Sequence, residues 1–211
     1  MVSNYKYILW DFDGVIIDSN HARVLGFERV LSEYPKNQVD QLLEYHARNG
    51  GLSRYVKFRY FFEDIRDEEV SEDRILGLAN QFSEIMKEIL TNTGLLIIDS
   101  IEFIRENHSK YHMHIVSGSD GAELRYLCTQ LDIAHFFNSI TGSPAPKTDL
   151  VKQLIDSNEI VGSEACLIGD AGNDFDAAYA NGIDFYGYNN PALKGTGKGY
   201  IEEFKFNSRL F

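Results

Sequence analysis

Cysteine is scarce in this chain of 211 residues, which contains only Cys128 and Cys166. Two thiols are too few for a disulfide framework, and both lie in apolar stretches that predict buried positions. Such sparing use of cysteine is typical of proteins from a reducing compartment. We therefore expect a cytoplasmic protein with both thiols in its core.

Positive charge is also in short supply. The chain has 20 Lys and Arg residues against 32 Asp and Glu residues, which gives a formal net charge of -12. This balance argues against nucleic acid and anionic membranes as partners. No apolar run approaches the length of a membrane span, and the apolar segment near the N-terminus is too short for a signal peptide.

Internal repeats and low-complexity tracts are absent as well. Hydrophobic residues make up 44% of the chain and aromatic residues 13%, which is enough to bury a core and argues against intrinsic disorder. The length fits one domain, or one domain that carries a large insertion. For the assembly we expect a monomer or a weak homodimer.

Short apolar runs alternate with amphipathic helical patterns along most of the chain. Such alternation predicts an α/β fold, with a Rossmann-like, doubly wound parallel sheet that is covered by helices on both faces. The strand-like runs lie at 7–10, 113–116, 139–141, 165–168 and 185–188. The helical patterns lie at 120–133, 147–158 and 173–182, each with Asp, Asn or Thr at or near its start.

One region breaks this alternation. Residues 20–93 contain no convincing strand, and their apolar residues recur at helical spacing. The simplest interpretation is an all-helical cap domain inserted after the first strand. We predict a core domain from 1–17 and 96–211, a cap domain from 18–95, and hinges near 15–19 and 93–99. The four helical segments are expected at 21–34, 37–49, 53–65 and 74–90.

Polar side chains follow several of the predicted strands. Asp11 and Asp13 come after the first, Ser117 ends the second, and Asp170 follows a later strand with Asp174 one helical turn beyond. Ligands of doubly wound sheets bind outside the carboxyl ends of the strands. Carboxylates that meet there repel one another unless a cation lies among them, and oxygen ligands suit Mg²⁺. A metal near Ser and Lys suggests phosphate chemistry.

Four ordered motifs carry a family resemblance. They are "DFDGV" at 11–15, "IVSGS" at 115–119, Lys147 in "SPAPKTDL", and "IGDAGNDFDAAYANGI" at 168–183. In this order and spacing they resemble the haloacid dehalogenase superfamily of hydrolases, in the branch of β-phosphoglucomutase and phosphoglycolate phosphatase. A single motif of this kind is modest evidence, whereas four in order across nearly the whole chain form a strong signal.

The resemblance implies roles for the acidic residues. Asp11 is the expected nucleophile, which takes the phosphoryl group as an aspartyl phosphate. Asp13 is the expected general acid, which protonates the leaving group and then activates water as a base. The implied Mg²⁺ ligands are Asp11, the main-chain carbonyl of Asp13, and Asp170, with Asp174 in or beside the coordination shell.

The resemblance also implies a phosphate site. Ser117, the backbone N–H of Gly118, and Lys147 are expected to hold the phosphoryl oxygens and to offset charge in the transition state. Ser117 is preferred to Ser119 because it ends the apolar run. Lys147 departs from the commoner family spacing, in which the lysine directly precedes a proline. Gly14 is expected to allow a turn that brings the backbone close to the ligand.

The predicted cap contains the stretch "NGGLSRYVKF" at 49–58. Its Gly-x-Ser-Arg core resembles the specificity loop of the β-phosphoglucomutase branch, which implies that Arg54 extends toward an anionic or hydroxyl-rich leaving group. The alternative is that Arg54 and Lys57 form an exposed helix face. The candidate specificity residues are Gly51, Ser53, Arg54, Lys57, His21 and Arg23.

The resemblance leaves three functions to compare. When "DSNHARVLGF" is aligned with the mutase branch, Arg23 falls where the mutase has its cap histidine. We therefore favour a Mg²⁺-dependent phosphatase that acts on a small phosphorylated metabolite, such as a sugar phosphate. A β-phosphoglucomutase-like mutase and a catalytically silent metabolite-binding module are the alternatives. The segment at 190–204 could fold over the site or complete the domain.

Overall fold

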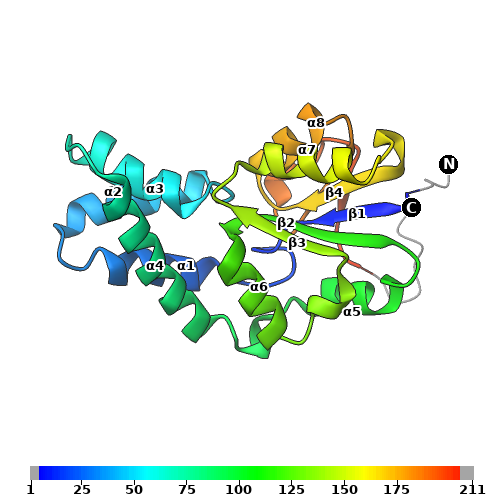
Figure 1. Ribbon diagram of the computed structural model, residues 1–211, viewed down its shortest axis with the longest axis horizontal. Coiled ribbons are helices and arrows are strands. Elements are labelled where there is room, and N and C mark those ends of the chain that lie inside the picture. Colours follow the sequence, from blue (N-terminus) through cyan, green and yellow to red (C-terminus); the bar gives the residue numbers. More distant parts are fainter. Residues whose placement is uncertain (1–4, 205–211) are drawn as a thin grey trace.

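The computed structural model describes residues 5–204, in which a parallel sheet of six strands forms the core (Figure 1). The strand order is β3-β2-β1-β4-β5-β6, and every neighbouring pair is parallel. The predicted doubly wound α/β fold is therefore confirmed. The strands are β1 (Tyr7–Trp10), β2 (His112–Asp120), β3 (Ser139–Ser143), β4 (Ala165–Gly169), β5 (Asp184–Tyr188) and β6 (Gly199–Ile201).

Helices cover both faces of this sheet (Figure 1). The central strand β1 shows why, since Ile8 and Trp10 pack into one apolar cluster and Leu9 packs into the other. Successive side chains of a strand point to opposite faces, so a strand that is apolar throughout needs cover on both. One face carries α5 (Ile98–Asn107) and α6 (Gly121–Gln130), and the other carries α7 (Lys147–Ser157) and α8 (Gly172–Ala180).

The predicted helical insertion after β1 is also confirmed, and it lies beyond the carboxyl ends of the strands (Figure 1). Aromatic side chains fill its interior. The ring of Phe27 lies 5.4 Å from that of Phe58 and 4.6 Å from that of Phe82, measured between centroids. The cap helices are α1 (Asn20–Val30), α2 (Lys36–Arg48), α3 (Arg54–Tyr60), which continues as a π-helical turn (Phe61–Ile65), and α4 (Glu72–Ile89).

The two chain segments that join cap and core run side by side. Ile17 and Leu96 form an antiparallel bridge, and the backbone N–H of Asp18 donates to the Leu95 carbonyl at 2.8 Å. The division into a core of 1–17 and 96–211 and a cap of 18–95, with its boundaries between these paired residues, stays a prediction. That the cap moves about these segments stays a prediction, and residues 1–4 and 205–211 lie outside the described part of the chain.

The C-terminal segment completes the sheet. Strand β6, which we did not predict, pairs with β5 through the register Gly187 to Tyr200. The segment is also tied to α5, because Asp99 accepts hydrogen bonds from the Tyr188 hydroxyl at 2.6 Å and from the Phe204 backbone N–H at 3.0 Å. No helix among residues 5–204 is long and apolar enough to cross a membrane.

Because β1 lies at the centre of the sheet, we expect substitutions of its buried side chains to destabilise the fold strongly. Leu9 is 0% exposed, so Leu9→Ala should lower the free energy of unfolding by about 2–5 kcal/mol because it leaves a cavity between β1 and the helices. Denaturant titration followed by circular dichroism measures this change. As a control, Leu76→Ala removes the same atoms from a residue that is 48% exposed and should change the stability by less than about 0.5 kcal/mol.

Candidate active site

Three strand ends meet at the predicted catalytic position. The register places Trp10 of β1 beside Ile115 of β2 and Ile168 of β4. Asp11 follows directly, and its backbone N–H donates to the Ile168 carbonyl at 2.9 Å. Because the strands are parallel and adjacent, Asp11 lies between Ser117 of β2 and the residues that follow β4.

A cluster of carboxylates results from this arrangement. Oxygens of Asp11, Asp170 and Asp174 lie within 4.8 Å of one another. Burial raises the pKa of Asp11 and Asp170, and repulsion among the carboxylates raises it further. Gly14 makes the approach feasible, since it has a φ of +73° and a Cβ atom there would overlap the Asp170 carboxylate. Three converging oxygen donors fit a divalent cation such as Mg²⁺.

Lys147 lies at the first position of α7 and is buried beside this cluster. Its ammonium is 2.9 Å from Asp11 Oδ1 and also forms an ion pair with Asp174. Burial alone lowers the pKa of Lys147, but the two carboxylates outweigh it and raise the pKa above its ordinary value. Asp174 is fully buried and accepts a further hydrogen bond from the Ala171 backbone N–H at 3.0 Å.

The two candidate serines have different partners. The Ser119 hydroxyl donates to Asp13 at 2.5 Å and accepts from Arg23 at 2.8 Å. The Ser117 hydroxyl accepts from the Ser119 backbone N–H at 3.1 Å and lines the cavity that contains Asp11. Ser117 thus has an O–H group available to a ligand in this cavity, whereas Ser119 serves to hold Asp13.

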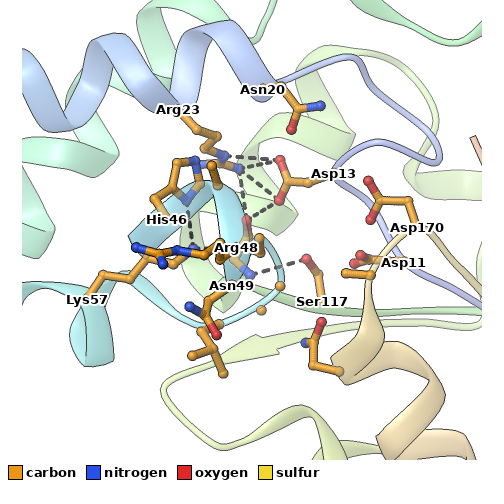
Figure 2. Close-up of a pocket in the computed structure, with 18 of the residues that line it drawn as sticks. Asp11, Asp13, Asn20, Arg23, His46, Arg48, Asn49, Lys57, Ser117 and Asp170 are labelled. Atoms are coloured by element: carbon orange, nitrogen blue, oxygen red, sulfur yellow. Dashed lines mark hydrogen bonds and ion pairs between the residues drawn. The ribbon is translucent and has the colours of Figure 1, made fainter. Parts of the chain in front are cut away.

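Asp13 faces the cap (Figure 2). Arg23 of α1 donates to its Oδ1 at 3.0 Å and to its Oδ2 at 3.3 Å, and the Ser19 hydroxyl donates as well. Burial by itself raises the pKa of Asp13, but Arg23 and the hydroxyls of Ser119 and Ser19 lower it to about 2. Asp13 is therefore a carboxylate at neutral pH while Arg23 contacts it.

A carboxylate that the sequence analysis did not single out joins the cap to the core. Glu123 of α6 has a side chain that is 0% exposed. It accepts from Arg23 at 2.7 Å and from Arg54 at 2.5 Å. Arg54 also donates to Ser83 at 2.8 Å and lies 4.5 Å above the ring of Phe82. The amphipathic pattern of α6 gave no sign that this glutamate is buried.

The predicted specificity residues separate into two groups. Arg23, Gly51, Arg54 and Lys57 line the cavity. Arg54 and Lys57 are only 4% and 2% exposed, so the alternative of an exposed helix face is wrong. Ser53 instead caps α3 by accepting from the Val56 backbone N–H at 3.5 Å, and His21 is exposed and outside the cavity lining.

The cavity between cap and core has a volume of about 550 Å³ and a clear separation of charge. Among its described lining residues, every acidic side chain belongs to the core and every basic side chain to the cap. The acids are Asp11, Asp13, Asp170 and Asp176, and the bases are Arg23, Arg48, Arg54 and Lys57. The cavity therefore has an acidic end at the sheet, which can bind a cation, and a basic end under the cap, which can bind an anion.

Two asparagines after β5 also belong to the site, and sequence reasoning missed them. Asn189 donates to the Gly14 carbonyl at 2.9 Å, and Asn190 donates to the Asp170 carbonyl at 2.7 Å. Both line the cavity and brace the loops that carry the carboxylates. The rule that located Asp11 and Asp170 could have found them, because they directly follow a predicted strand.

Comparison with known proteins settles the family. The sequence model described as "Haloacid dehalogenase-like hydrolase" matches residues 8–188. The chain belongs to this family. The resemblance read from the four motifs is thereby confirmed, and so is the expectation that the protein is a hydrolase of the haloacid dehalogenase type.

Individual relatives are distant but span nearly the whole chain. A phosphoglycolate phosphatase of Colwellia psychrerythraea is 26% identical over 198 residues, which cover 87% of this chain and 86% of the relative. A phosphoglycolate phosphatase of Aliivibrio fischeri is 23% identical over 221 residues, which cover 98% and 96%.

Solved structures share the fold. CbbY from Rhodobacter sphaeroides in complex with phosphate has a TM-score of 0.74 at 12% identity, with 95% of both chains covered. The β-phosphoglucomutase of Clostridium difficile also has a TM-score of 0.74, at 13% identity, with 95% of this chain and 92% of that chain covered. At these identities the likeness describes the architecture only.

The carboxylate cluster predicts an effect of cations on stability. The pKa of Asp170 is raised to about 8 in the folded protein, so the folded state binds more protons than the unfolded state and stability falls as the pH rises toward 8. In EDTA at pH 8, Asp170→Asn should therefore be more stable than the wild type. At Mg²⁺ concentrations about 100 times the dissociation constant, the wild type should gain roughly 2.7 kcal/mol.

The measurement is the unfolding temperature in EDTA and in Mg²⁺ at pH 5 and pH 8. The variant should gain less from Mg²⁺ than the wild type does, because it lacks one ligand. Equal stabilisation of both proteins by Mg²⁺ would show that the cluster is not the cation site.

The Glu123 pairs predict a second effect on stability. Glu123→Gln leaves Arg23 and Arg54 without a shared counter-charge, and breaking a buried ion pair costs about 3–5 kcal/mol of unfolding free energy. Glu84→Gln is a matched control, because Glu84 is 74% exposed and pairs with Lys87 at 2.8 Å, and exposed pairs contribute at most about 1 kcal/mol. Similar losses in the two variants, measured by urea titration, would contradict the bridging role of Glu123.

Proposed function

We propose that this protein is a Mg²⁺-dependent phosphatase that hydrolyses a small phosphomonoester, such as a sugar phosphate or a similar metabolite, through an aspartyl phosphate. The observation that carries the proposal is the contact between Asp11 and Lys147, 2.9 Å apart, at the acidic end of a cavity with a basic opposite end. The printed names of the two relatives, both phosphoglycolate phosphatases, support a phosphatase.

In the first step an oxygen of Asp11 bonds to phosphorus while the bond from phosphorus to the leaving oxygen breaks. Lys147, the Ser117 hydroxyl and the backbone N–H of Gly118 would donate to the phosphoryl oxygens, where negative charge must be offset. A Mg²⁺ ion held by Asp11, the main-chain carbonyl of Asp13, and Asp170, with Asp174 beside them, would offset that charge further.

Asp13 handles the protons in both steps. Protonating the leaving oxygen requires the acid form of Asp13, which its contact with Arg23 disfavours, so we infer that Arg23 withdraws with the cap helix α1 in that step. In the second step the carboxylate removes a proton from the water that attacks phosphorus, and Arg23 stabilises this form of Asp13. Hydrolysis releases phosphate and restores Asp11.

The defining experiment is phosphate release from a panel of phosphorylated metabolites in Mg²⁺ and in EDTA. Release that depends on Mg²⁺ and favours one compound supports the phosphatase. Isomerisation of a sugar phosphate without net release would instead indicate a mutase. Binding without turnover of any compound would indicate a silent metabolite-binding module.

A single substitution at Asp11 tests whether this residue is the nucleophile. Asp11→Asn should reduce phosphate release by about 10³-fold or more, because an amide cannot form the aspartyl phosphate. Asp156→Asn is the control, since Asp156 is 62% exposed and its partner is Lys152 on the same helix, and it should leave the rate unchanged. Near-normal turnover by the Asp11 variant would refute the proposed mechanism.

A further inference from the structure

Lys57 is a buried cation without a carboxylate partner among residues 5–204. It is 2% exposed and lines the cavity from α3. Its ammonium contacts only neutral groups, which are His46 Nδ1 at 2.9 Å and the Gly50 carbonyl at 2.8 Å. Burying an ammonium is unfavourable unless it is paired, so the missing counter-charge needs an explanation.

The neighbouring arginines of the cavity lining differ from Lys57 in their counter-charges. Arg23 is paired with Asp13 and Glu123, and Arg54 is paired with Glu123. The remaining basic residue of the lining, Arg48, is 74% exposed and can be neutralised by solvent. Among the described lining residues, Lys57 is thus the buried cation that is not already paired with a carboxylate of the protein. A negatively charged ligand group could bind it without displacing one.

The hydrogen-bond geometry leaves room for such a charge. An ammonium has three donors, and two of those of Lys57 are used by His46 and Gly50. Burial lowers the pKa of His46 to about 3, with help from Lys57 and Arg23, so its ring is neutral. Nδ1 then accepts from the Lys57 ammonium, which can only donate. One donor of Lys57 remains, and Figure 2 shows Lys57 across the cavity from Asp11 and Asp170.

We propose that Lys57, backed by His46, forms a subsite for a carboxylate on the leaving group of the phosphomonoester. The proposal rests on the proposed phosphatase function and narrows its substrate class. A compact ammonium with a single remaining donor matches one carboxylate oxygen, whereas a second phosphate group would need more donors. Arg54, which sequence reasoning favoured for this contact, is instead engaged by Glu123 and Ser83.

The charges around Lys57 make the subsite sensitive to pH. Burial lowers the pKa of Lys57 to about 7, Arg23 of α1 and Arg54 of α3 lower it too, and Asp13 after β1 raises it. His46 of α2 is neutral in this range. A bound carboxylate favours the ammonium form, so recognition of the carboxylate should weaken as the pH rises above 7.

The test compares two substrates that differ in one group, 2-phosphoglycolate and 2-hydroxyethyl phosphate. In Lys57→Met the ratio of their kcat/KM values should fall roughly 10-fold to 100-fold, mainly through KM, because a charge-assisted hydrogen bond is lost. The kcat/KM for 2-hydroxyethyl phosphate should fall by a smaller factor, because this compound has no carboxylate for Lys57 to bind. Lys57→Arg should preserve most of the ratio and make it independent of pH between 7 and about 9, since Arg stays protonated.

Three results would overturn the proposal. One is an equal loss on both substrates in Lys57→Met, which would mean that Lys57 only supports the loop at Gly50. Another is a wild-type enzyme without preference for the carboxylate compound. A third is preference for a bisphosphate over 2-phosphoglycolate that disappears in Lys57→Met, which would assign the subsite to a second phosphate.

Calorimetry separates this proposal from the proposed function. If no phosphomonoester is hydrolysed, the phosphatase assignment fails, but binding of both compounds to the wild type and to Lys57→Met can still be compared. Tighter binding of 2-phosphoglycolate that is lost in Lys57→Met supports the subsite regardless of turnover. Equal binding of the two compounds to the wild type overturns it.

Discussion

The carboxyl ends of β1 and β4 place negative charges together at the centre of the molecule. Both strands are buried, adjacent and parallel, so Asp11 and Asp170 cannot separate without disrupting the sheet. The rest of the site compensates for this repulsion. Lys147 pairs with Asp11, and Gly14 gives the Asp170 carboxylate the space it needs. A divalent cation would complete the compensation.

The cap supplies the opposite charge. Its basic residues face the acidic core across the cavity, and under the proposed function this division would orient a phosphomonoester with its phosphoryl group at the sheet and its leaving group under the cap. Glu123 is the exception, a core carboxylate that binds Arg23 and Arg54 of the cap. It bridges cap and core through both arginines, which leaves Lys57 as the buried cation of the described lining without a carboxylate partner.

Features that depend on a local sequence pattern could be predicted from the sequence. Features that depend on contacts with residues far away in the chain could not. Apolar runs located five of the strands, and strand ends located Asp11 and Asp170. The three-residue β6, Gly199–Ile201, begins with glycine and is too short to show a period, and its own sequence does not reveal its pairing with β5. The burial of Glu123 depends on arginines from two other helices, and no pattern within α6 reveals such contacts.

The proposed mechanism requires a phosphoryl group on Asp11, and trapping this covalent intermediate shows whether it forms. The enzyme is mixed with radiolabelled acetyl phosphate and Mg²⁺, quenched in acid within one turnover, and mapped by peptide mass spectrometry. We expect label on the peptide that contains Asp11, lability of that label to hydroxylamine, and no label in Asp11→Asn. Turnover without label on this peptide, or label retained in the variant, would contradict it.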